Sequence, residues 1–307
     1  MPSLRDIKKR INNVGVIEKI TQSMKVISTT RLAVAKETRY NNTKYFSTAK
    51  VVTKKIFDFY KTSKNLSTFS SELFIEKDKY INTMIIFIAS DRGLCGAYNS
   101  NVFRQVATKV LNIGYDYTTL VPIGAKSLAF SNNMGKTQAI KGVSSNLKDL
   151  QDYELPLLAY QITQLVKDKT VDSIQIVYTK SLSVLEQVVL TKLLLPILPK
   201  KTAMEAEKVA KKHPETPINL ESQQINTDVE TAGYNIEELF YRYILANLED
   251  KLAHAQVAEH ASRLNAMDTA NSNSKDLKDS LNLEYNKTRQ NVITRELIEI
   301  ISGAESI

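Results

Sequence analysis

The stretch SLRDIKKRINNVGVIEKITQSMKVIST, residues 3–29, decides the fold class because its apolar residues recur at helical spacing. Steps of three or four place them on one face of an α-helix, at Ile7, Ile11, Val14, Ile17, Ile20, Met24 and Ile27. Ser3 can cap this helix, and Asp6 can bond back to it. A helix from Ser3 to about Tyr60 is roughly 87 Å long at ~1.5 Å per residue. It must therefore lie along a second helix or project from a domain.

The end of the chain supplies a second long helix. No glycine or proline interrupts the sequence between Tyr234 and Ser302, and Gly303 stands where a helix-ending glycine is expected. Apolar or small residues recur there at helical spacing, at Leu245, Leu248, Leu252, Ala255, Ala258, Ala261, Ser262, Ala266, Ala270, Leu277, Leu281, Tyr285, Ile293, Leu297, Ile300 and Ala304. Two striped helices from opposite ends of one chain predict an antiparallel coiled coil.

The second stripe is interrupted by polar residues. Ser272, Asp276 and Asp279 fall where the seam of a two-helix coiled coil favours leucine. Two interpretations stay open: the surface between the helices is reached by solvent, or a further protein clasps this length of the coiled coil.

Strands alternate with helices between the two ends. Apolar and β-branched runs predict strands at Met84–Ser90, Thr118–Ile123, Ser173–Tyr178 and Val184–Leu195. Helical spacing predicts helices at Tyr98–Leu111, Lys126–Phe130 and Leu155–Lys167. This alternation is typical of an α/β layer with a partly parallel sheet. We therefore divide the chain into an N-terminal helix (1–62), an α/β domain (80–199), a polar loop (200–228) and a C-terminal helix (229–307).

The composition excludes several classes of protein. Of the 307 residues, 43% are apolar and 24% charged, which is ordinary for a folded soluble protein. A single cysteine, Cys95, excludes a disulfide framework. No apolar run reaches the ~20 residues of a membrane helix. His254 and His260 lack the spacing of a zinc helix, so we expect ordinary polar helix positions, no metal site and no cofactor.

The turn Asp91–Gly96, DRGLCG, is a candidate phosphate site because it follows a strand and opens a helix. Its glycine spacing is GxxG rather than GxGxxG, however, and no Walker-type sequence is present. A tight strand-to-helix turn is the favoured interpretation. No histidine lies near Cys95 in the sequence, which favours an inert thiol, and we expect no catalytic residues.

Positive charge is concentrated in the first helix. Residues 1–64 carry 15 lysines and arginines against 4 acidic residues, a net charge of +11, whereas the whole chain carries +8. A helix with this charge suits nucleic acid or an acidic protein surface. An ordinary solvated basic face is the third possibility.

Three separated blocks resemble the gamma subunits of F-type ATP synthases. They are residues 3–29, SDRGLCGAYNS at 90–100, and the final helix with ASRLNAMDTANSNSKDL at 261–277 and YNKTRQNVITRELIEIISGAESI at 285–307. The resemblance implies a coiled-coil shaft with a Rossmann-like α/β domain inserted between its helices. It also implies a non-catalytic rotor that couples proton-driven rotation to conformational changes in the beta subunits during ATP synthesis.

The same resemblance implies the partners. They are the alpha and beta subunits of the catalytic ring, small central-stalk subunits of the delta or epsilon type, and the c-type ring of the membrane. The chain is expected to lie peripheral to the membrane and to bind no nucleic acid. Its basic first helix would face an acidic lever of the beta subunits.

The matching motifs also imply contact residues. Met24, Lys25 and Arg31 would face the lever, whereas Arg289 and Gln290 would touch a loop of a beta subunit. An apolar bearing at the top of the ring would be formed by Ile293, Leu297, Ile300 and Ile301. The alternative for these four is packing against the first helix.

The cellular location is implied by the resemblance as well. Residues 16–32, VIEKITQSMKVISTTRL, look more like mitochondrial than bacterial members. A single cysteine argues against the redox control of chloroplast members. No Arg-rich transit segment is evident, so the chain is interpreted as a processed mitochondrial form or a bacterial protein that starts at Met1. We favour the matrix side of the mitochondrial inner membrane over the cytoplasmic face of a bacterial plasma membrane.

Overall fold

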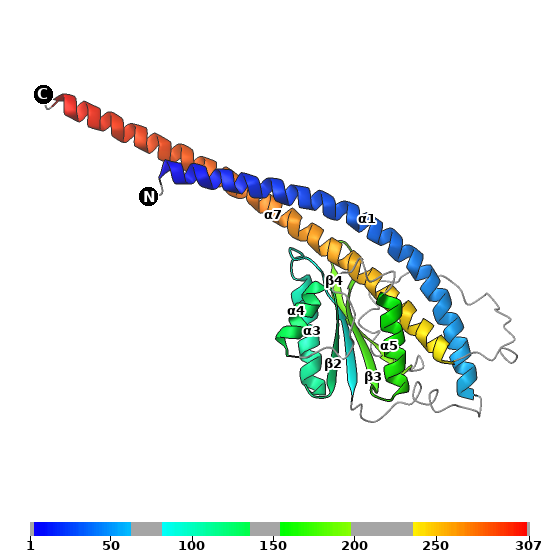
Figure 1. Ribbon diagram of the computed structural model, residues 1–307. Helices are drawn as coiled ribbons and strands as arrows, with labels where there is room; N and C mark the ends of the chain where they lie inside the picture. Colours follow the sequence, from blue (N-terminus) through cyan, green and yellow to red (C-terminus); the bar gives the residue numbers. More distant parts are fainter. Residues whose placement is uncertain (1–2, 63–81, 136–153, 198–235, 306–307) are drawn as a thin grey trace. The chain divides into compact units, whose positions relative to one another are not determined.

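Two long helices and a four-stranded sheet make up the computed structural model, which describes residues 3–62, 82–135, 154–197 and 236–305. Helix α1 spans Leu4–Thr62 and helix α7 spans Ile236–Glu305 (Figure 1). Both long helices are therefore confirmed, although α7 passes through Gly303 instead of ending there. The polar loop predicted at 200–228 and the predicted helix start at 229–235 lie outside the described residues.

The chain divides into two compact units, each built from parts of both long helices. One unit comprises residues 1–31 and 263–307, and the other comprises residues 32–262. The second unit contains the sheet. We describe each unit by itself.

The sheet of the larger unit has the order β2-β1-β3-β4. Strands β1 (Thr83–Ile88), β2 (Thr118–Ile123) and β3 (Ser173–Ser181) are parallel, and β4 (Gln187–Leu195) is antiparallel to β3. The partly parallel sheet is thus confirmed. Strand β4 starts three residues later than predicted, because Ser183 Oγ accepts hydrogen bonds from the backbone N–H groups of Leu185 and Glu186 and closes a turn.

Helices cover both faces of the sheet. One face packs against α3 (Tyr98–Ile113) and α4 (Ala125–Asn133), whose phenyl rings Phe103 and Phe130 stack at 4.4 Å. The other face packs against α5 (Leu155–Lys167) and the first half of α7. Strand β1 is buried along its whole length, as expected for a central parallel strand covered on both faces.

The smaller unit is an antiparallel coiled coil. In α1 every seventh residue is buried, namely Ile7, Val14, Thr21 and Ser28, with Ile11, Glu18 and Lys25 half-buried between them. In α7 a series of buried and half-buried positions follows the same repeat, at Leu264, Met267, Asn271, Ser274, Lys278, Leu281, Tyr285, Thr288 and Val292. We call these two sets the seam. Steps of three and four that sum to seven are the geometry of a coiled coil, so this prediction is confirmed.

The apolar stripe predicted for α1 is wrong at Ile17, Ile20 and Ile27, whereas Met24 is half-buried. After Val14, the next seam residue of α1 is Glu18, four positions on. The next apolar residue of the predicted stripe is Ile17, only three positions on. That early step rotates Ile17, Ile20 and Ile27 out of the seam. Polar and small residues take their places there.

The polar interruptions predicted for the α7 seam are also wrong. Ser272, Asp276 and Asp279 are exposed. The seam instead contains other polar residues, at Asn271, Ser274 and Lys278. Both interpretations of the interruptions, solvent access between the helices and a further protein around the coiled coil, were therefore based on residues outside the seam.

The amino end of α1 is capped as its sequence predicts. The backbone N–H of Asp6 donates to Ser3 Oγ at 3.2 Å, and Ser3 Oγ donates to Asp6 Oδ2 at 2.7 Å. The hydrogen bonds that the hydroxyl and the backbone N–H of Ser3 donate to the Asp6 carboxylate lower the pKa of that carboxyl. The negative charge stands at the positive end of the helix, where it is favourable.

The seam predicts a sharp difference between two nearby leucines of α7. Leu281 is 3% exposed and Leu283 is 72% exposed. Leu281→Ala is expected to lower the free energy of local unfolding by about 2 kcal/mol or more, because a buried methyl-rich side chain is lost. Hydrogen exchange of the surrounding α7 amides measures this change. Leu283→Ala is the matched control, and equal acceleration in both variants would contradict the seam.

Candidate functional site

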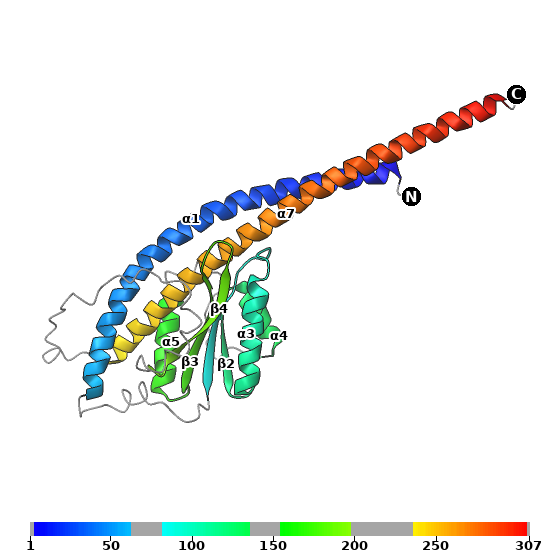
Figure 2. The ribbon, with the colours of Figure 1, turned by 180° about the vertical axis from the view of Figure 1, so that it is seen from behind.

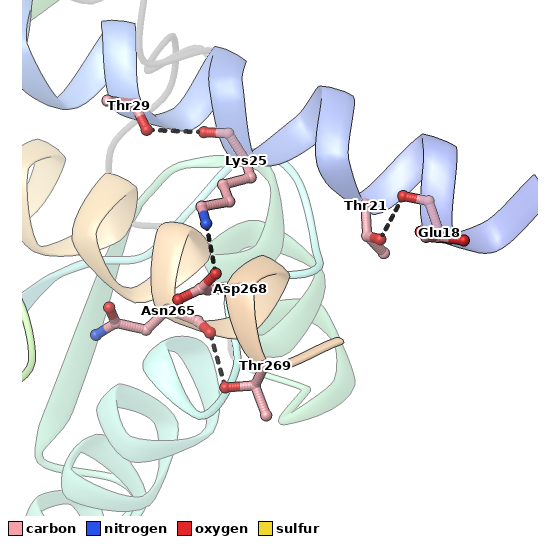
Figure 3. A network of polar contacts seen from close by, with 7 residues as sticks. All are labelled: Glu18, Thr21, Lys25, Thr29, Asn265, Asp268 and Thr269. Atoms are coloured by element: carbon pink, nitrogen blue, oxygen red, sulfur yellow. Dashed lines mark hydrogen bonds and ion pairs between the residues drawn. The ribbon is translucent and has the colours of Figure 1, made fainter. Parts of the chain in front are cut away.

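Lys25, one of the predicted contact residues, is already engaged within the chain. Its Nζ lies 2.6 Å from Asp268 Oδ1 of α7, and Thr29 Oγ1 donates to the Lys25 carbonyl at 3.0 Å (Figure 3). Both charged side chains remain partly exposed, at 36% and 60%. Ion pairs in such surroundings are screened by water and add little net stability. This pair therefore orients Lys25 more than it stabilises the fold.

A second ion pair crosses the same seam. Lys278 Nζ lies 2.8 Å from Glu18 Oε2. The hydrogen bond from Lys278 lowers the pKa of Glu18, and the bond to Glu18 raises the pKa of Lys278. Met24 lies half-buried between the two pairs, and Arg31 is exposed. Met24 thus lies beside the seam, next to the seam residue Lys25.

The side of α1 away from the seam carries apolar side chains that are exposed to solvent. We call Val16, Ile17, Ile20, Val26 and Ile27 the outer face; they are between 50% and 57% exposed. Clusters of exposed apolar side chains on a soluble protein often mark a surface that another molecule covers. Our sequence analysis missed this surface because it assigned Ile17, Ile20 and Ile27 to the seam. The early step of three after Val14 was the signal that could have revealed it.

The carboxyl end of α7 extends beyond α1. The last half-buried seam residues are Thr288 and Val292, opposite the first turn of α1. Beyond them α7 runs past the amino end of α1, as Figures 1 and 2 show. Arg289 and Gln290 are exposed at this junction.

The four predicted bearing residues lie on this free end. Ile293, Leu297, Ile300 and Ile301 are between 47% and 68% exposed. Packing against the first helix, the alternative to a bearing, is therefore not how the structure uses them. Their role toward another subunit stays a prediction.

The turn Asp91–Gly96 is held by hydrogen bonds to α4 and α7. Asp91 Oδ1 accepts a hydrogen bond from the backbone N–H of Ala125 at 3.1 Å, at the start of α4. The Ser262 hydroxyl of α7 donates to the Cys95 carbonyl at 2.7 Å. The Asp91 carboxylate thus binds the start of α4, and the backbone of the turn is fixed to α7, which supports the tight turn. Cys95 is buried among Tyr98 and Ala258, as an inert thiol would be.

His254 is not the ordinary polar position that we expected. It is 8% exposed, with Nε2 at 3.8 Å from Asp250 Oδ1. Lys251 beside it pairs with Asp250 and lies 4.9 Å from the Phe46 ring and 5.4 Å from the Tyr178 ring. These charges are buried on a helix face that is otherwise apolar, and only the contacts of α1 and β3 reveal them. The sequence of α7 alone carries no such signal.

Burial lowers the pKa of His254 to about 4. The Asp250 carboxylate acts in the opposite direction, whereas the cations of Lys251, Arg39 and Lys180 act with burial. The imidazole is consequently neutral at pH 7. No group of three or more metal-ligating side chains occurs within the described ranges.

The buried histidine predicts a loss of stability in acid. Below the ordinary pKa of 6.5 the unfolded chain binds a proton at His254, but the folded chain does not until about pH 4. The free energy of unfolding is therefore expected to fall by about 2 kcal/mol more between pH 7.5 and 5 than in His254→Gln. Urea unfolding at the two pH values measures this difference. The same pH dependence in both proteins would contradict the prediction.

The described helices include none with an apolar window long enough to span a bilayer. Three exposed surfaces are candidates for contact with other molecules. Those surfaces are the outer face of α1, the paired charges beside Met24 and the free end of α7.

Comparisons with known proteins agree with this architecture. The family model described as ATP synthase matches residues 3–307. The ATP synthase gamma chain of Geotalea daltonii is 32% identical over 309 residues, covering 100% of this chain and 99% of the relative. That of Mycoplasmopsis pulmonis is 32% identical over 313 residues, covering 99% of each.

Two solved structures share the fold. The central stalk and c-ring structure of the Tetrahymena thermophila mitochondrial ATP synthase matches with a TM-score of 0.53 and 20% identity, covering 82% of this chain and 99% of that chain. The Euglena gracilis mitochondrial ATP synthase in rotational state 3 matches with a TM-score of 0.51 and 18% identity, covering 90% and 94%. The match of the family model over almost the whole sequence, together with relatives at 32% identity, shows that the chain belongs to the family of ATP synthase gamma chains.

Proposed function

We propose that this chain is the central-stalk rotor subunit of a proton-translocating F-type ATP synthase. It couples rotation of the membrane ring to conformational changes in the catalytic beta subunits. As a gamma chain it is non-catalytic, and the catalytic sites lie in the beta subunits. The observation that carries the proposal is the outer face of α1: the seam is already covered by α7, yet a second apolar face remains bare.

The ring of alpha and beta subunits is the proposed cover for that face. A shaft that turns inside a ring needs contacts that are many and individually weak, because a strong buried ion pair would stall it. Half-exposed apolar side chains and screened surface charges meet this requirement. The basic first helix adds attraction toward the acidic lever of the beta subunits.

Two levels of contact are proposed along the shaft. At the lower level the lever meets Met24, Lys25 and Arg31. At the upper level Arg289 and Gln290 touch a beta-subunit loop. The apolar bearing is then formed by Ile293, Leu297, Ile300 and Ile301, all exposed and free to meet the ring.

The α/β domain is proposed to face the membrane side of the assembly. Its partners there are the c-type ring and the small delta- or epsilon-type stalk subunits. The Tetrahymena structure similar in fold is titled as a central stalk with c-ring, which supports this placement.

The chain is part of a peripheral, membrane-associated ATP synthase complex. We propose the matrix side of the mitochondrial inner membrane, on the likeness of residues 16–32 to mitochondrial members. The named curated relatives are bacterial, so the alternative is the cytoplasmic face of a bacterial plasma membrane. Protease protection of the tagged chain in isolated organelles distinguishes the two.

Affinity purification tests the function. The tagged chain is isolated from its native membranes, its partners are identified by mass spectrometry, and ATPase activity of the eluate is measured. Recovery of alpha and beta subunits with ATPase activity is expected. Recovery of the chain alone, or with nucleic acid, would overturn the proposal.

A further inference from the structure

The centre of the seam is built from groups that contribute poorly to coiled-coil stability. Thr21 and Ser28 of α1 and Asn271 and Ser274 of α7 are all buried there. Asn271 Oδ1 has no hydrogen-bond partner among the described residues. Buried polar groups without partners cost free energy, and polar seam residues are best attested as devices that select a register. The polar centre therefore points to a role in alignment.

Layers of small polar residues select the register of α1 against α7 only weakly on their own, because neighbouring layers resemble one another. The two interhelical ion pairs supply the missing distinction. Glu18 of α1 is negative and meets positive Lys278, whereas one heptad further on Lys25 is positive and meets negative Asp268. The sign alternates along each helix, and both pairs form only in one alignment.

A slip of α7 by one heptad destroys both pairs. In one direction Lys25 moves from Asp268 to Lys275, which sets two cations against each other, and Glu18 moves to Tyr285. In the other direction Glu18 moves to Asn271 and Lys25 to an alanine. Like charges repel and unpaired ones lose their partners, so each slipped register is penalised.

We propose that the pairs Glu18–Lys278 and Lys25–Asp268 fix the register of α1 against α7. This inference rests on the proposed function in one respect: the register sets the height of Arg289 and Gln290 relative to Met24. A slip of one heptad moves the end of α7 by about 10 Å along α1. The lower contact residues on α1 and the upper ones on α7 could then no longer meet their beta-subunit partners at the same time.

Disulfide reporters within the seam read the register directly. Val14 lies one turn before Glu18 and Leu281 one turn after Lys278, so the two share a layer in the native register. A Val14→Cys/Leu281→Cys chain is expected to cross-link in that register. Thr21→Cys/Leu281→Cys reports the slip that brings Lys25 to Lys275. Cys95 is buried and does not compete.

The test introduces charge reversals into both cysteine-pair variants, Val14→Cys/Leu281→Cys and Thr21→Cys/Leu281→Cys. Each variant is expressed as the full-length chain in the organism that normally makes it. E18K/K25E makes both native pairs repulsive and lets residue 25 attract Lys275 after the slip. The ratio of native to slipped cross-link, read on non-reducing gels, is expected to fall about tenfold. Adding D268K/K278E restores both pairs with exchanged signs, and the ratio is expected to return to that of the parent. The matched control, E284K/K287E, reverses two exposed charges of α7 and leaves the ratio unchanged.

Two results would overturn the proposal: an unchanged ratio in E18K/K25E, or failure of the fourfold exchange to restore it. Should E18K/K25E not accumulate, recovery of the chain by the fourfold exchange supports the register role, and continued loss overturns it. The cross-links report contacts inside one chain, so they are informative even if the chain purifies without alpha and beta subunits. That last outcome contradicts the rotor function and not the register.

Discussion

Replacing Arg289 by alanine is expected to lower the steady-state ATP turnover of the assembled complex by about tenfold or more. Arg289 is exposed at the point where α7 passes beyond α1. Arginines that anchor an interface typically cost about 2 kcal/mol or more on truncation, and about 1.4 kcal/mol is a factor of ten. The proposed partner is a beta-subunit loop whose state changes with the angle of the shaft.

The controls separate this role from assembly. Lys287→Ala removes a cation from a nearby exposed position of the same helix and should leave turnover unchanged. Arg289→Lys keeps the charge but loses the planar fork, so an intermediate rate is expected. The assembled complex is quantified on native gels before each assay. Full turnover in Arg289→Ala would show that the contact is elsewhere.

Replacing Met24 by lysine is expected to lower ATP-driven proton pumping at least threefold relative to ATP hydrolysis, with assembly intact. Met24 lies half-buried beside the Lys25–Asp268 pair, so a flexible ammonium there can still reach outward. Toward an acidic lever it would turn a weak sliding contact into a charge-assisted hydrogen bond. ATP hydrolysis would continue, but a smaller share of it would drive rotation of the membrane ring.

Two neighbouring variants test whether position and charge both matter. Met24→Leu retains an apolar side chain of similar volume and should pump normally. Ser23→Lys adds the same charge at an exposed position on another face of α1, and a small effect is expected. Pumping by Met24→Lys equal to that of the parent, at equal hydrolysis, would remove Met24 from the proposed contact.

Elements with a local signature were predicted closely from the sequence. Thr118–Ile123 and Leu155–Lys167 have the bounds expected from their patterns, and the cap at Ser3 forms as predicted. In each case the information lies within a few residues: β-branched runs, helical spacing, or a hydroxyl and a carboxylate three positions apart. Such signals do not depend on the rest of the chain.

The predictions that failed concern features that depend on a segment distant in the sequence. The face of α1 that is buried depends on where α7 lies, and a single early step at Ile17 moved the apolar residues to the other side. Lys25 gave no sign of its partner, because Asp268 is 243 positions away. The burial of His254 likewise depends on another element, because the Tyr178 ring of β3 lies 6.2 Å from its imidazole. Periodicity identifies a helix but does not say which of its faces a distant helix will cover.

The free end of α7 has a consequence for how the complex forms. Residues 293–305 make about three and a half turns at 3.6 residues per turn, without a neighbouring segment of α1. Isolated helices shorter than about 12–15 residues are marginal in water. This end continues α7 and needs no nucleus of its own, but because no α1 segment packs against it, we expect it to fray in the free chain and to be ordered by the subunits that surround it. We therefore expect binding of the ring to order the tip, and the entropy lost in that ordering to moderate the affinity of the shaft for the ring.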